Sequence, residues 1–411
     1  MLLYNLSIYL YSFIVALISP FHKKARMTRE GQKKTYSLLR EKIDKDAKYI
    51  WFHAASLGEF EQGRPMIEKI KSDYPGYKVL LTFFSPSGYE VRKNYNGADI
   101  ICYLPFDTPG RVRRFMNLVN PAVAIFIKYE FWYNYLSTLK KRNIPTYIIS
   151  AIFRKDQIFF KWYGGFYRKV LGCFNHLYVQ DEASKTLLEE YGVDNVTVAG
   201  DTRFDRVLDI QSQARVLDVV ESFAGKDNKG KIMIAGSSWP QDEEIFVDYF
   251  NEHPEMKLII APHEIHEEHI KSIITLLKRP YIRMSEATKE NVSDKDCLII
   301  DCFGLLSSIY RYGDIAYIGG GFGVGIHNTL EAAVYGIPVI FGPNYTKFKE
   351  ARDLISVGGA FSIDDKSSFK NKIEKLLNND DLLNKSGHEA GHYVKNNAGG
   401  TERILRDLSL Y

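Results

Sequence analysis

The sequence has few cysteines, a small net charge and no low-complexity basic tract. Its four cysteines stand far apart or in apolar, strand-like surroundings, which is unlike a disulfide framework or a zinc site and indicates a reducing compartment. The formal net charge of only +4 over 411 residues is too small to imply nucleic acid as the main partner. The cysteines are Cys102, Cys173, Cys297 and Cys302.

The overall composition is typical of a folded chain. Hydrophobic residues make up 45% and charged residues 25% of the sequence, so no half of it is expected to be disordered. A chain of this length is too long for one ordinary hydrophobic core. We therefore expect two domains of about two hundred residues each.

The first 21 residues lack any charged side chain, and the residues that follow are basic. An apolar run of this length just reaches what a bilayer-spanning helix needs, so residues 1–21 are predicted to be a membrane anchor. The basic cluster behind it places the rest of the chain in the cytoplasm by the positive-inside rule. The cluster consists of His22, Lys23, Lys24, Arg26, Arg29, Lys33 and Lys34.

The order of charge and apolarity at the N-terminus argues against a secretory signal, which carries its positive charge before the apolar run. A core helix is one alternative to the spanning anchor. The other is an interfacial helix with Asn5, Ser7 and Ser12 on its wet face, and this version would also tether the protein to a membrane surface.

Beyond residue 48 the chain alternates strands with helices, which predicts parallel, doubly wound α/β sheets. We divide it into an N-terminal Rossmann-like domain over residues 22–205, a polar linker region over 206–228 and a C-terminal Rossmann-like domain over 229–411, the two domains facing a cleft. The expected strands are 48–55, 77–83, 100–104, 123–127, 146–150, 177–180 and 196–199, then 232–235, 257–261, 297–300, 315–318, 339–341 and 360–363.

The stretch 314–343, DIAYIGGGFGVGIHNTLEAAVYGIPVIFGP, reads as a strand, a glycine loop, a helix and a second strand. Glycines leave little side chain to keep an anion from the backbone amides, so the loop suits a phosphate. A helix opened by His327 and Asn328 carries Glu331, whose carboxylate can accept two hydrogen bonds from a ribose diol. We therefore expect a nucleotide pocket here. The plainer alternative is a tight turn followed by a solvated glutamate.

The first-half counterpart of this loop is the stretch from Trp51 to Glu59, WFHAASLGE. The strand ends in small residues, Gly58 allows a sharp turn, and Glu59 opens the next helix. A carboxylate at a helix start stays ionised and can act as a general base. The alternative is that Glu59 only favours the first helical turn.

Several separated motifs, in order along nearly the whole chain, resemble those of the Kdo transferases. These are inverting GT-B glycosyltransferases that move 3-deoxy-D-manno-octulosonic acid (Kdo) from CMP-Kdo onto the lipid A precursor at the membrane. The matching stretches are the N-terminal apolar segment, HAASLGE (53–59), EFW with Asn134 (130–134), GDTRFD (200–205), AGSS (235–238), APH (261–263) and GGGFGVGIHNTLEAAVYGIPVIFGP (319–343).

The resemblance implies roles for particular residues. Glu59 matches the catalytic base, and Glu130 and Arg203 match positions that stabilise the transition state, the second usually a lysine in this family. The segments implied to contact CMP supply Pro262, His263, Phe303, Gly304, Leu305, Gly321, Gly323, Asn328, Thr329, Leu330 and Glu331. His263 departs from the arginine common in the family, and Lys128 stands where a second acidic residue is frequent.

The implied chemistry needs no metal or other cofactor. CMP leaves with a single phosphate, whose charge the loop amides and Arg203 can meet. Attack by an acceptor hydroxyl, with Glu59 as the base, inverts the anomeric centre through an oxocarbenium-like state.

Two rival functions stay open on the sequence. One keeps the fold and changes the donor, as in a GT-B transferase or an epimerase that uses a UDP-sugar. The other is a membrane-tethered nucleotide-binding regulator without turnover. A further cluster, His263, His266 and His269 with glutamates between them, invites a metal interpretation, but a polar strand-to-helix turn explains it better because the His-Glu-x-x-His pattern is missing.

Overall fold

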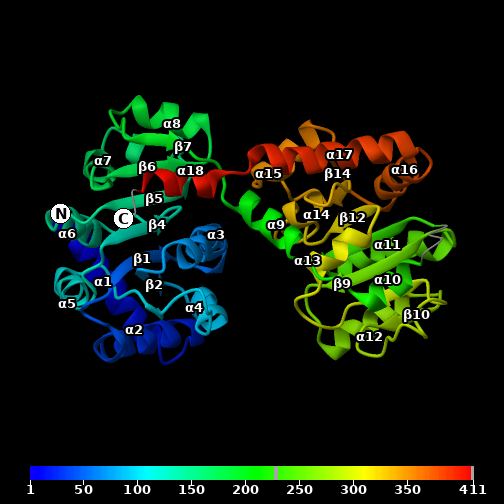
Figure 1. The fold of residues 1–411 in the computed structure, drawn as a ribbon, viewed down its shortest axis with the longest axis horizontal. Helices are drawn as coiled ribbons and strands as arrows, with labels where there is room; N and C mark the ends of the chain where they lie inside the picture. The colour runs from blue at the N-terminus through cyan, green and yellow to red at the C-terminus, as the bar shows by residue number, and fades with distance from the viewer. Residues whose placement is uncertain (226–229, 409–411) are drawn as a thin grey trace. The chain divides into compact units, whose positions relative to one another are not determined.

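The computed structural model describes residues 1–225 and 230–408, and it divides the chain into two compact α/β units. Residues 1–206 and the C-terminal segment from Ala398 form the first unit, and residues 207–397 form the second (Figure 1). Each unit is built around its own sheet, and each is described separately.

The first unit contains a seven-stranded sheet in which every pairing is parallel and the order is β3-β2-β1-β4-β5-β6-β7. The chain builds outward from β1 to β3 and then reverses to the other side of β1, so β1 and β4 flank a topological switch point. The strands are β1 (Lys48–Ala54), β2 (Tyr77–Phe83), β3 (Ile100–Tyr103), β4 (Val123–Ile127), β5 (Thr146–Ala151), β6 (His176–Val179) and β7 (Val196–Val198).

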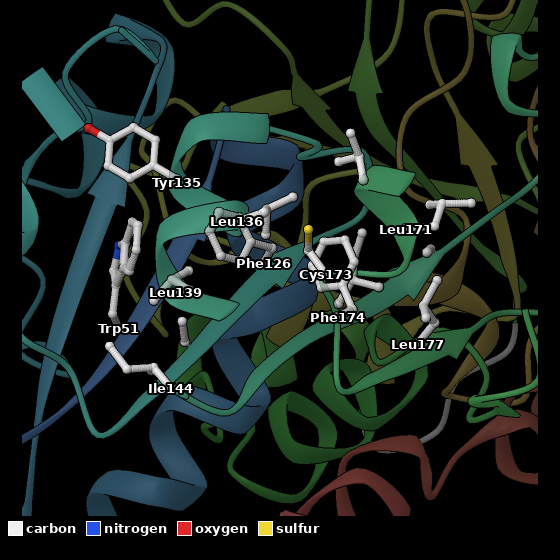
Figure 2. Close-up of a cluster of buried hydrophobic side chains, with 14 of the residues drawn as sticks. Trp51, Phe126, Tyr135, Leu136, Leu139, Ile144, Leu171, Cys173, Phe174 and Leu177 are labelled. Atoms are coloured by element: carbon white, nitrogen blue, oxygen red, sulfur yellow. The ribbon is translucent and has the colours of Figure 1, made fainter. Parts of the chain in front are cut away.

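Helices cover both faces of this sheet, and apolar side chains fill the space between them. One cluster joins Trp51 of β1 and Phe126 of β4 to Tyr135 and Leu136 of the helix that follows (Figure 2). The helices are α1 (Leu2–Ile18), α2 (Lys23–Lys42), α3 (Leu57–Asp73), α4 (Pro86–Arg92), α5 (Pro109–Val119), α6 (Tyr133–Lys141), α7 (Gly165–Leu171), α8 (Glu182–Glu189) and α18 (Gly400–Asp407), with a 3₁₀ turn at Ile158–Phe160. Helix α9 (Arg203–Ser212) carries the chain past the boundary between the units.

The second unit repeats the plan with a parallel seven-stranded sheet in the order β10-β11-β9-β8-β12-β13-β14. Its switch point lies between β8 and β12. The strands are β8 (Ile232–Ser238), β9 (Lys257–Pro262), β10 (Tyr281–Arg283), β11 (Cys297–Ile299), β12 (Ile315–Ile318), β13 (Val339–Phe341) and β14 (Ala360–Ser362). The helices are α10 (Asp218–Ala224), α11 (Pro240–Glu252), α12 (Glu267–Leu276), α13 (Leu306–Ile309), α14 (Leu330–Ala333), α15 (Lys349–Ser356), α16 (Lys366–Leu377) and α17 (Asp380–Asn397), with a 3₁₀ turn at Tyr310–Tyr312.

The two doubly wound parallel sheets expected from the alternating pattern are confirmed. The domain limits differ from the expected ones, because α10 lies within the second unit and the chain returns to the first unit at Ala398. Residues 226–229 of the expected linker region and C-terminal domain, and residues 409–411, lie outside the described residues.

The return of the chain is fixed by specific contacts. The carboxylate of Asp205 accepts hydrogen bonds from the backbone amides of Gly399 and Thr401, and Arg403 donates to the carbonyl of Ala199. Ile404 of α18 is fully buried in the apolar cluster beneath α3. Figure 1 shows this last helix, in red, beside β6 and β7.

The N-terminal helix α1 has its polar side turned toward the protein. Asn5 accepts a hydrogen bond from the Asn134 amide at 2.8 Å, and Ser12 accepts one from Arg111 at 3.1 Å. The expectation that these two residues form the wet face of an interfacial helix is therefore wrong, because the protein rather than water satisfies them. Among the described residues, the hydroxyl of Ser7 donates only to the carbonyl of Tyr4.

The expected spanning helix over residues 1–21 is not found as such. In the part of the chain that the structure describes, no single helix combines the length and the apolar composition needed to cross a bilayer. Helices α1 and α2 meet that requirement only when taken together, and they are bent by 116° relative to one another.

Candidate functional site

The carboxyl ends of β1 and β4 lie side by side at the switch point of the first sheet, and the expected catalytic residues follow these two strands. Glu59 lies in the first turn of α3, directly after β1. Glu130 comes three residues after β4. A switch point is where open α/β sheets form their binding crevices, so the topology alone brings both carboxylates to one edge.

Glu59 is held at the start of α3 by a capping box. Its Oε2 accepts a hydrogen bond from the Ser56 amide at 3.0 Å and another from the Ser56 hydroxyl. This contact supports the helix start, as the plainer interpretation of the sequence has it. The other carboxylate oxygen, Oε1, has no hydrogen-bond partner among the described residues, and Glu59 is half-buried.

Glu130 is 7% exposed and belongs to a buried polar chain. Its Oε2 lies 2.9 Å from Nε2 of His53 and accepts a 2.6 Å hydrogen bond from the indole of Trp132. On the far side of His53, Nδ1 lies 2.9 Å from the hydroxyl of Thr82, which also accepts from the indole of Trp51. Both ring contacts of His53 are hydrogen bonds when the Thr82 hydroxyl donates to Nδ1 and the protonated Nε2 donates to Glu130. The carboxylate is therefore fixed in position.

Arg203 begins α9 and forms a tight pair with Asp201. Its backbone amide and its Nε each lie 2.9 Å from an oxygen of that carboxylate, and its Nη2 lies at 2.7 Å. Burial would raise the pKa of Asp201, but the guanidinium of Arg203 and the ammonium of Lys128 bring it below its ordinary value. This segment touches α3, because the amide of Gln62 lies 3.4 Å from both Asp201 oxygens.

Backbone strain gathers at the same edge. Lys128 (φ 68°) directly follows β4, and Ser150 (φ 54°) lies near the end of β5. Side chains other than glycine rarely adopt such angles, and strained residues cluster at functional sites. Lys128 stands where a second acidic residue is frequent in the resembling family, and it places a cation two residues before Glu130 and near Asp201.

In the second unit, the glycine loop follows β12 at the switch point, and it is packed tightly on its own backbone. A Cβ on Gly319 would come within 2.2 Å of the Ser237 carbonyl, and one on Gly321 within 2.5 Å of the Gly342 amide. These glycines are thus needed for close backbone approach. Ser237 itself has a strained φ of 53°.

Most amides of the loop are used within the protein, which limits the expected phosphate cradle. Gly319 donates to the carbonyl of Gly236, Gly323 and Gly325 to that of Gly320, and Gly320 to the carboxylate of Asp242 at 2.9 Å. Among the five glycines, only the amide of Gly321 has no acceptor in the described part of the chain. The plainer interpretation, a tight turn, accounts for the other four.

Asp242 at the start of α11 is the residue that holds the loop to the sheet. Besides Gly320, it accepts hydrogen bonds from the Trp239 amide at 3.0 Å and the Tyr317 hydroxyl at 2.9 Å. Burial raises the pKa of this carboxyl. Asp242 was not predicted from the sequence, although its place three residues after Trp239 and two after Pro240 is typical of a helix start.

His263 lies in a stack of three rings above the ends of β8, β9 and β12. The ring centroids of His263 are 4.7 Å from Trp239 and 4.3 Å from His327, with interplanar angles of 26° and 24°. The Trp239 indole donates to Nε2 of His327 at 3.0 Å. Burial, with His263 nearby, lowers the pKa of His327 to about 4, so this ring is neutral at pH 7. A stack of flat rings thus stands where the resembling family has an arginine.

The remaining expected contacts follow β11 and β12 in the same unit. Phe303 is 79% exposed beyond β11, Gly304 has a positive φ of 87°, and Leu305 precedes α13. The helix expected from His327 is shorter than predicted, because α14 is one turn, Leu330–Ala333. Pro262 ends β9, Leu330 is buried at the start of α14, and Gly321 and Gly323 lie in the glycine loop.

Glu331 is oriented by its neighbour in that turn. The Asn328 amide donates to Oε1 of Glu331 at 3.0 Å, and Oδ1 of Asn328 accepts from the Leu330 amide at 3.2 Å. Thr329 is fully buried, and its hydroxyl has no partner in the described residues. These groups lie at the switch point together with the ring stack.

The other two histidines of the predicted polar turn have structural partners. His266 caps α12, since its Nδ1 accepts from the His269 amide. His269 is buried with Nε2 3.0 Å from Glu243, which also accepts from Ser238. The turn interpretation therefore accounts for both. No group of three metal-ligating side chains is found within the described residues.

The fold and the two sites define a class: paired doubly wound domains with polar residues at both switch points, as in GT-B glycosyltransferases and related UDP-sugar enzymes. The chain resembles a UDP-GlcNAc 2-epimerase from Neisseria meningitidis, solved with UDP-GlcNAc, with a TM-score of 0.62 and 14% identity over 88% of this chain and 99% of that one. A glycosyltransferase from Rickettsia africae gives a TM-score of 0.55 and 14% identity, covering 88% and 98%. These likenesses show the fold.

Sequence comparison narrows the class. Residues 25–206 match the family model described as 3-deoxy-D-manno-octulosonic-acid transferase (kdotransferase). The chain is 27% identical over 336 residues to the 3-deoxy-D-manno-octulosonic acid transferase of Aquifex aeolicus, covering 80% of this chain and 86% of that one. It is 27% identical over 378 residues to the Haemophilus influenzae enzyme of that name, covering 88% and 87%. The resemblance to Kdo transferases is confirmed, and the chain is a glycosyltransferase related to them.

Proposed function

We propose that the protein transfers Kdo from CMP-Kdo to a hydroxyl of the lipid A precursor, with inversion at the anomeric carbon. The observation that carries the proposal is that Glu59 and Glu130 follow the two strands at the switch point of the first sheet, while Gln62 of α3 contacts Asp201, the partner of Arg203. The relatives from Aquifex aeolicus and Haemophilus influenzae are Kdo transferases by name. Each residue type suits a different part of that reaction.

Glu59 is the general base in this proposal. Its Oε2 is tied to Ser56, which fixes the carboxylate, and Oε1 is left to accept the proton of the acceptor hydroxyl. Glu130, held by His53 and Trp132, places a fixed negative charge where positive charge develops on the sugar. Arg203 and Lys128 supply cations for the acidic donor.

The second unit holds the cytidylate in this proposal. Glu331, oriented by Asn328, accepts hydrogen bonds from the ribose diol, and the buried hydroxyl of Thr329 and the amide of Gly321 are donors for the phosphate. The stack of Trp239, His263 and His327 offers a flat face for a pyrimidine ring. Pro262, Phe303, Gly304, Leu305, Gly323 and Leu330 shape the walls.

A membrane-borne acceptor fits helix α1, whose outer face is apolar. Leu3 is 80% and Phe13 64% exposed. A continuous apolar surface of this kind is unfavourable in water and typical of a binding or membrane surface. The inner face of α1 reaches the catalytic edge, because Tyr11 contacts Phe84 and Phe84 packs 4.9 Å from Trp132, the partner of Glu130. We therefore place the protein on the cytoplasmic face of the inner membrane, with α1 lying in the interface.

The test is an assay with purified protein, CMP-Kdo and a detergent-dispersed lipid A precursor. Transfer that disappears in Glu59→Ala while CMP still raises the melting temperature supports the proposal. Transfer retained by that variant removes Glu59 from the reaction. The fold neighbours that act on UDP-sugars make the main rival testable in the same way: stabilisation by UDP and not by CMP would favour a UDP-sugar enzyme.

A further inference from the structure

A cavity of about 240 Å³ lies in the first unit between α1, α2 and the segment that leads into α5. Its floor is apolar, formed by the buried side chains of Val15, Tyr36 and Phe106. Its rim carries three cations, Arg29, Lys33 and Arg111, and no carboxylate lines it. It shares no residue with the edge that holds Glu59, Glu130 and Arg203.

Two of the cations are oriented by serines of the region around α1. Arg29 donates from Nη1 to the hydroxyl of Ser19 at 3.0 Å, and Arg111 donates from Nη1 to that of Ser12 at 3.1 Å. Each guanidinium keeps further N–H groups beyond this bond. Within the described residues, neither arginine nor Lys33 forms an ion pair with a carboxylate. All three side chains are exposed, so an anion from the surroundings can reach them and accept hydrogen bonds from their remaining N–H groups.

The side chain of Gln32 adds an uncharged donor to the cavity wall. Gln32 is 7% exposed, and its Nε2 is buried without a hydrogen-bond partner in the described part of the chain. A buried amide that lacks an acceptor costs free energy unless something fills that role. The cavity thus combines four donor side chains, and the group that completes them is an acceptor with several oxygens, as a phosphate is.

The surroundings of the cavity decide which phosphate fits. The lining residues Ser12 and Ala16 alternate along α1 with Phe13 and Leu17, which are both 64% exposed. A free phosphate would complete the donors but leave this apolar face in water. A phosphate joined to acyl chains satisfies both, since the chains lie along α1 and the headgroup enters the cavity.

We propose that this cavity binds the phosphate of an anionic bilayer phospholipid, at a site separate from the transfer site. The inference rests on the proposed membrane location of the enzyme. The bound headgroup fixes the rotation of the first unit on the membrane, because the cavity and α1 engage the bilayer together.

The test is co-sedimentation with vesicles of phosphatidylcholine alone and of phosphatidylcholine with a minor fraction of phosphatidylglycerol. The pocket variant is Arg29→Gln/Lys33→Gln/Arg111→Gln. The control variant is Lys23→Gln/Lys24→Gln/Lys34→Gln, which removes the same charge from α2 at positions that do not line the cavity. If only a diffuse basic surface attracted the vesicles, the pocket variant and the control variant would lose the same affinity.

We expect the pocket variant to lose about tenfold more affinity for the phosphatidylglycerol vesicles than the control variant, with binding to phosphatidylcholine alone unchanged. Gln32→Leu keeps every charge and is expected to lose about threefold to tenfold in affinity, the net value of one ordinary hydrogen bond. Equal losses in the two triple variants, together with no effect of Gln32→Leu, would overturn the proposal. If a triple variant unfolds, the single change Lys33→Gln, at an exposed side chain, still gives a comparison with Lys34→Gln.

Two further measurements separate the possible sources of the phosphate. Inorganic phosphate exchanged for chloride at constant ionic strength should leave vesicle binding intact, and release of the protein would point to a free-anion site instead. In the detergent transfer assay the pocket variant should keep the acceptor KM of the wild type. A raised KM would make the cavity an acceptor subsite and contradict the bilayer assignment. A wild type that transfers no Kdo but prefers the anionic vesicles refutes the proposed function alone.

Discussion

Changing the buried contact between His53 and Glu130 is the most specific test of the role that we propose for Glu130. His53 is fully buried in β1 and touches no substrate in our proposal, so we regard it as a positioning residue for Glu130. His53→Phe keeps an aromatic ring next to Phe126 but removes both polar contacts of the imidazole. Glu130 would keep its bond from Trp132 and lose its second donor.

The structure allows the size of the effect to be worked out. A buried hydrogen bond to a charged group contributes about 1.5–3 kcal/mol. If that free energy holds the carboxylate in its reactive position, kcat falls about tenfold to a hundredfold, because about 1.4 kcal/mol corresponds to a factor of ten in rate. The donor KM should change little, since CMP is assigned to the other unit. His53→Gln, which restores an amide donor, should recover part of kcat.

Steady-state kinetics on His53→Phe, Glu130→Gln and the double variant test this reasoning. Two residues that act through one contact give a double variant no slower than the slower single variant. Losses that multiply would refute the positioning role. A change confined to the melting temperature, with kcat intact, would refute it as well, because it would leave His53 a purely structural residue.

Three other perturbations have expected outcomes. Glu59→Gln should abolish turnover by removing the base while calorimetry shows unchanged CMP affinity, and normal turnover would contradict the assignment. His263→Ala should weaken CMP binding about threefold to tenfold through loss of ring stacking, and because the pKa of His327 is lowered to about 4, CMP affinity should show no titration of that ring between about pH 6 and 8. Burial raises the pKa of Asp107 to about 6, so the folded state holds this proton more tightly than the unfolded chain, and up to about 3 kcal/mol of stability should be lost as pH rises from about 4 to 6. Denaturant unfolding of Asp107→Asn should lack that slope, and a wild type whose stability rises over the same interval would contradict it.

Much of the fold could be predicted from the sequence because parallel strands buried on both faces are short apolar runs. Val123–Ile127 and Ile315–Ile318 are examples, and each expected strand is present. Strand β10 was missed, since Tyr281–Arg283 is three residues long and exposes Tyr281. The return of α18 was also missed, because its contact with Asp205 joins residues nearly two hundred positions apart.

The candidate site was predictable where residue type and position agree. Glu59 and Glu130 follow strands, and strand order places them at one edge. The partners that orient them were not predictable. In the sequence, His53 is one more buried strand residue and Asp242 one more residue at a helix start. Only the folded structure shows that His53 contacts Glu130 and that Asp242 accepts from Gly320. The predicted orientation of α1 was wrong for a related reason. Its polar residues were expected to face water, but Asn134 and Arg111 donate hydrogen bonds to them instead.

The packing of α18 on the first unit has a consequence for synthesis. The strands of that unit lie within the first 198 residues. The helix that packs on α3 and donates backbone hydrogen bonds to Asp205 is synthesised only after residue 399. The second unit, residues 207–397, can thus complete its own sheet while the earlier unit still lacks a helix. A chain that ends at residue 397 would hold the whole second unit but a first unit without α18, and we expect that first unit to resist proteases only in the full-length chain.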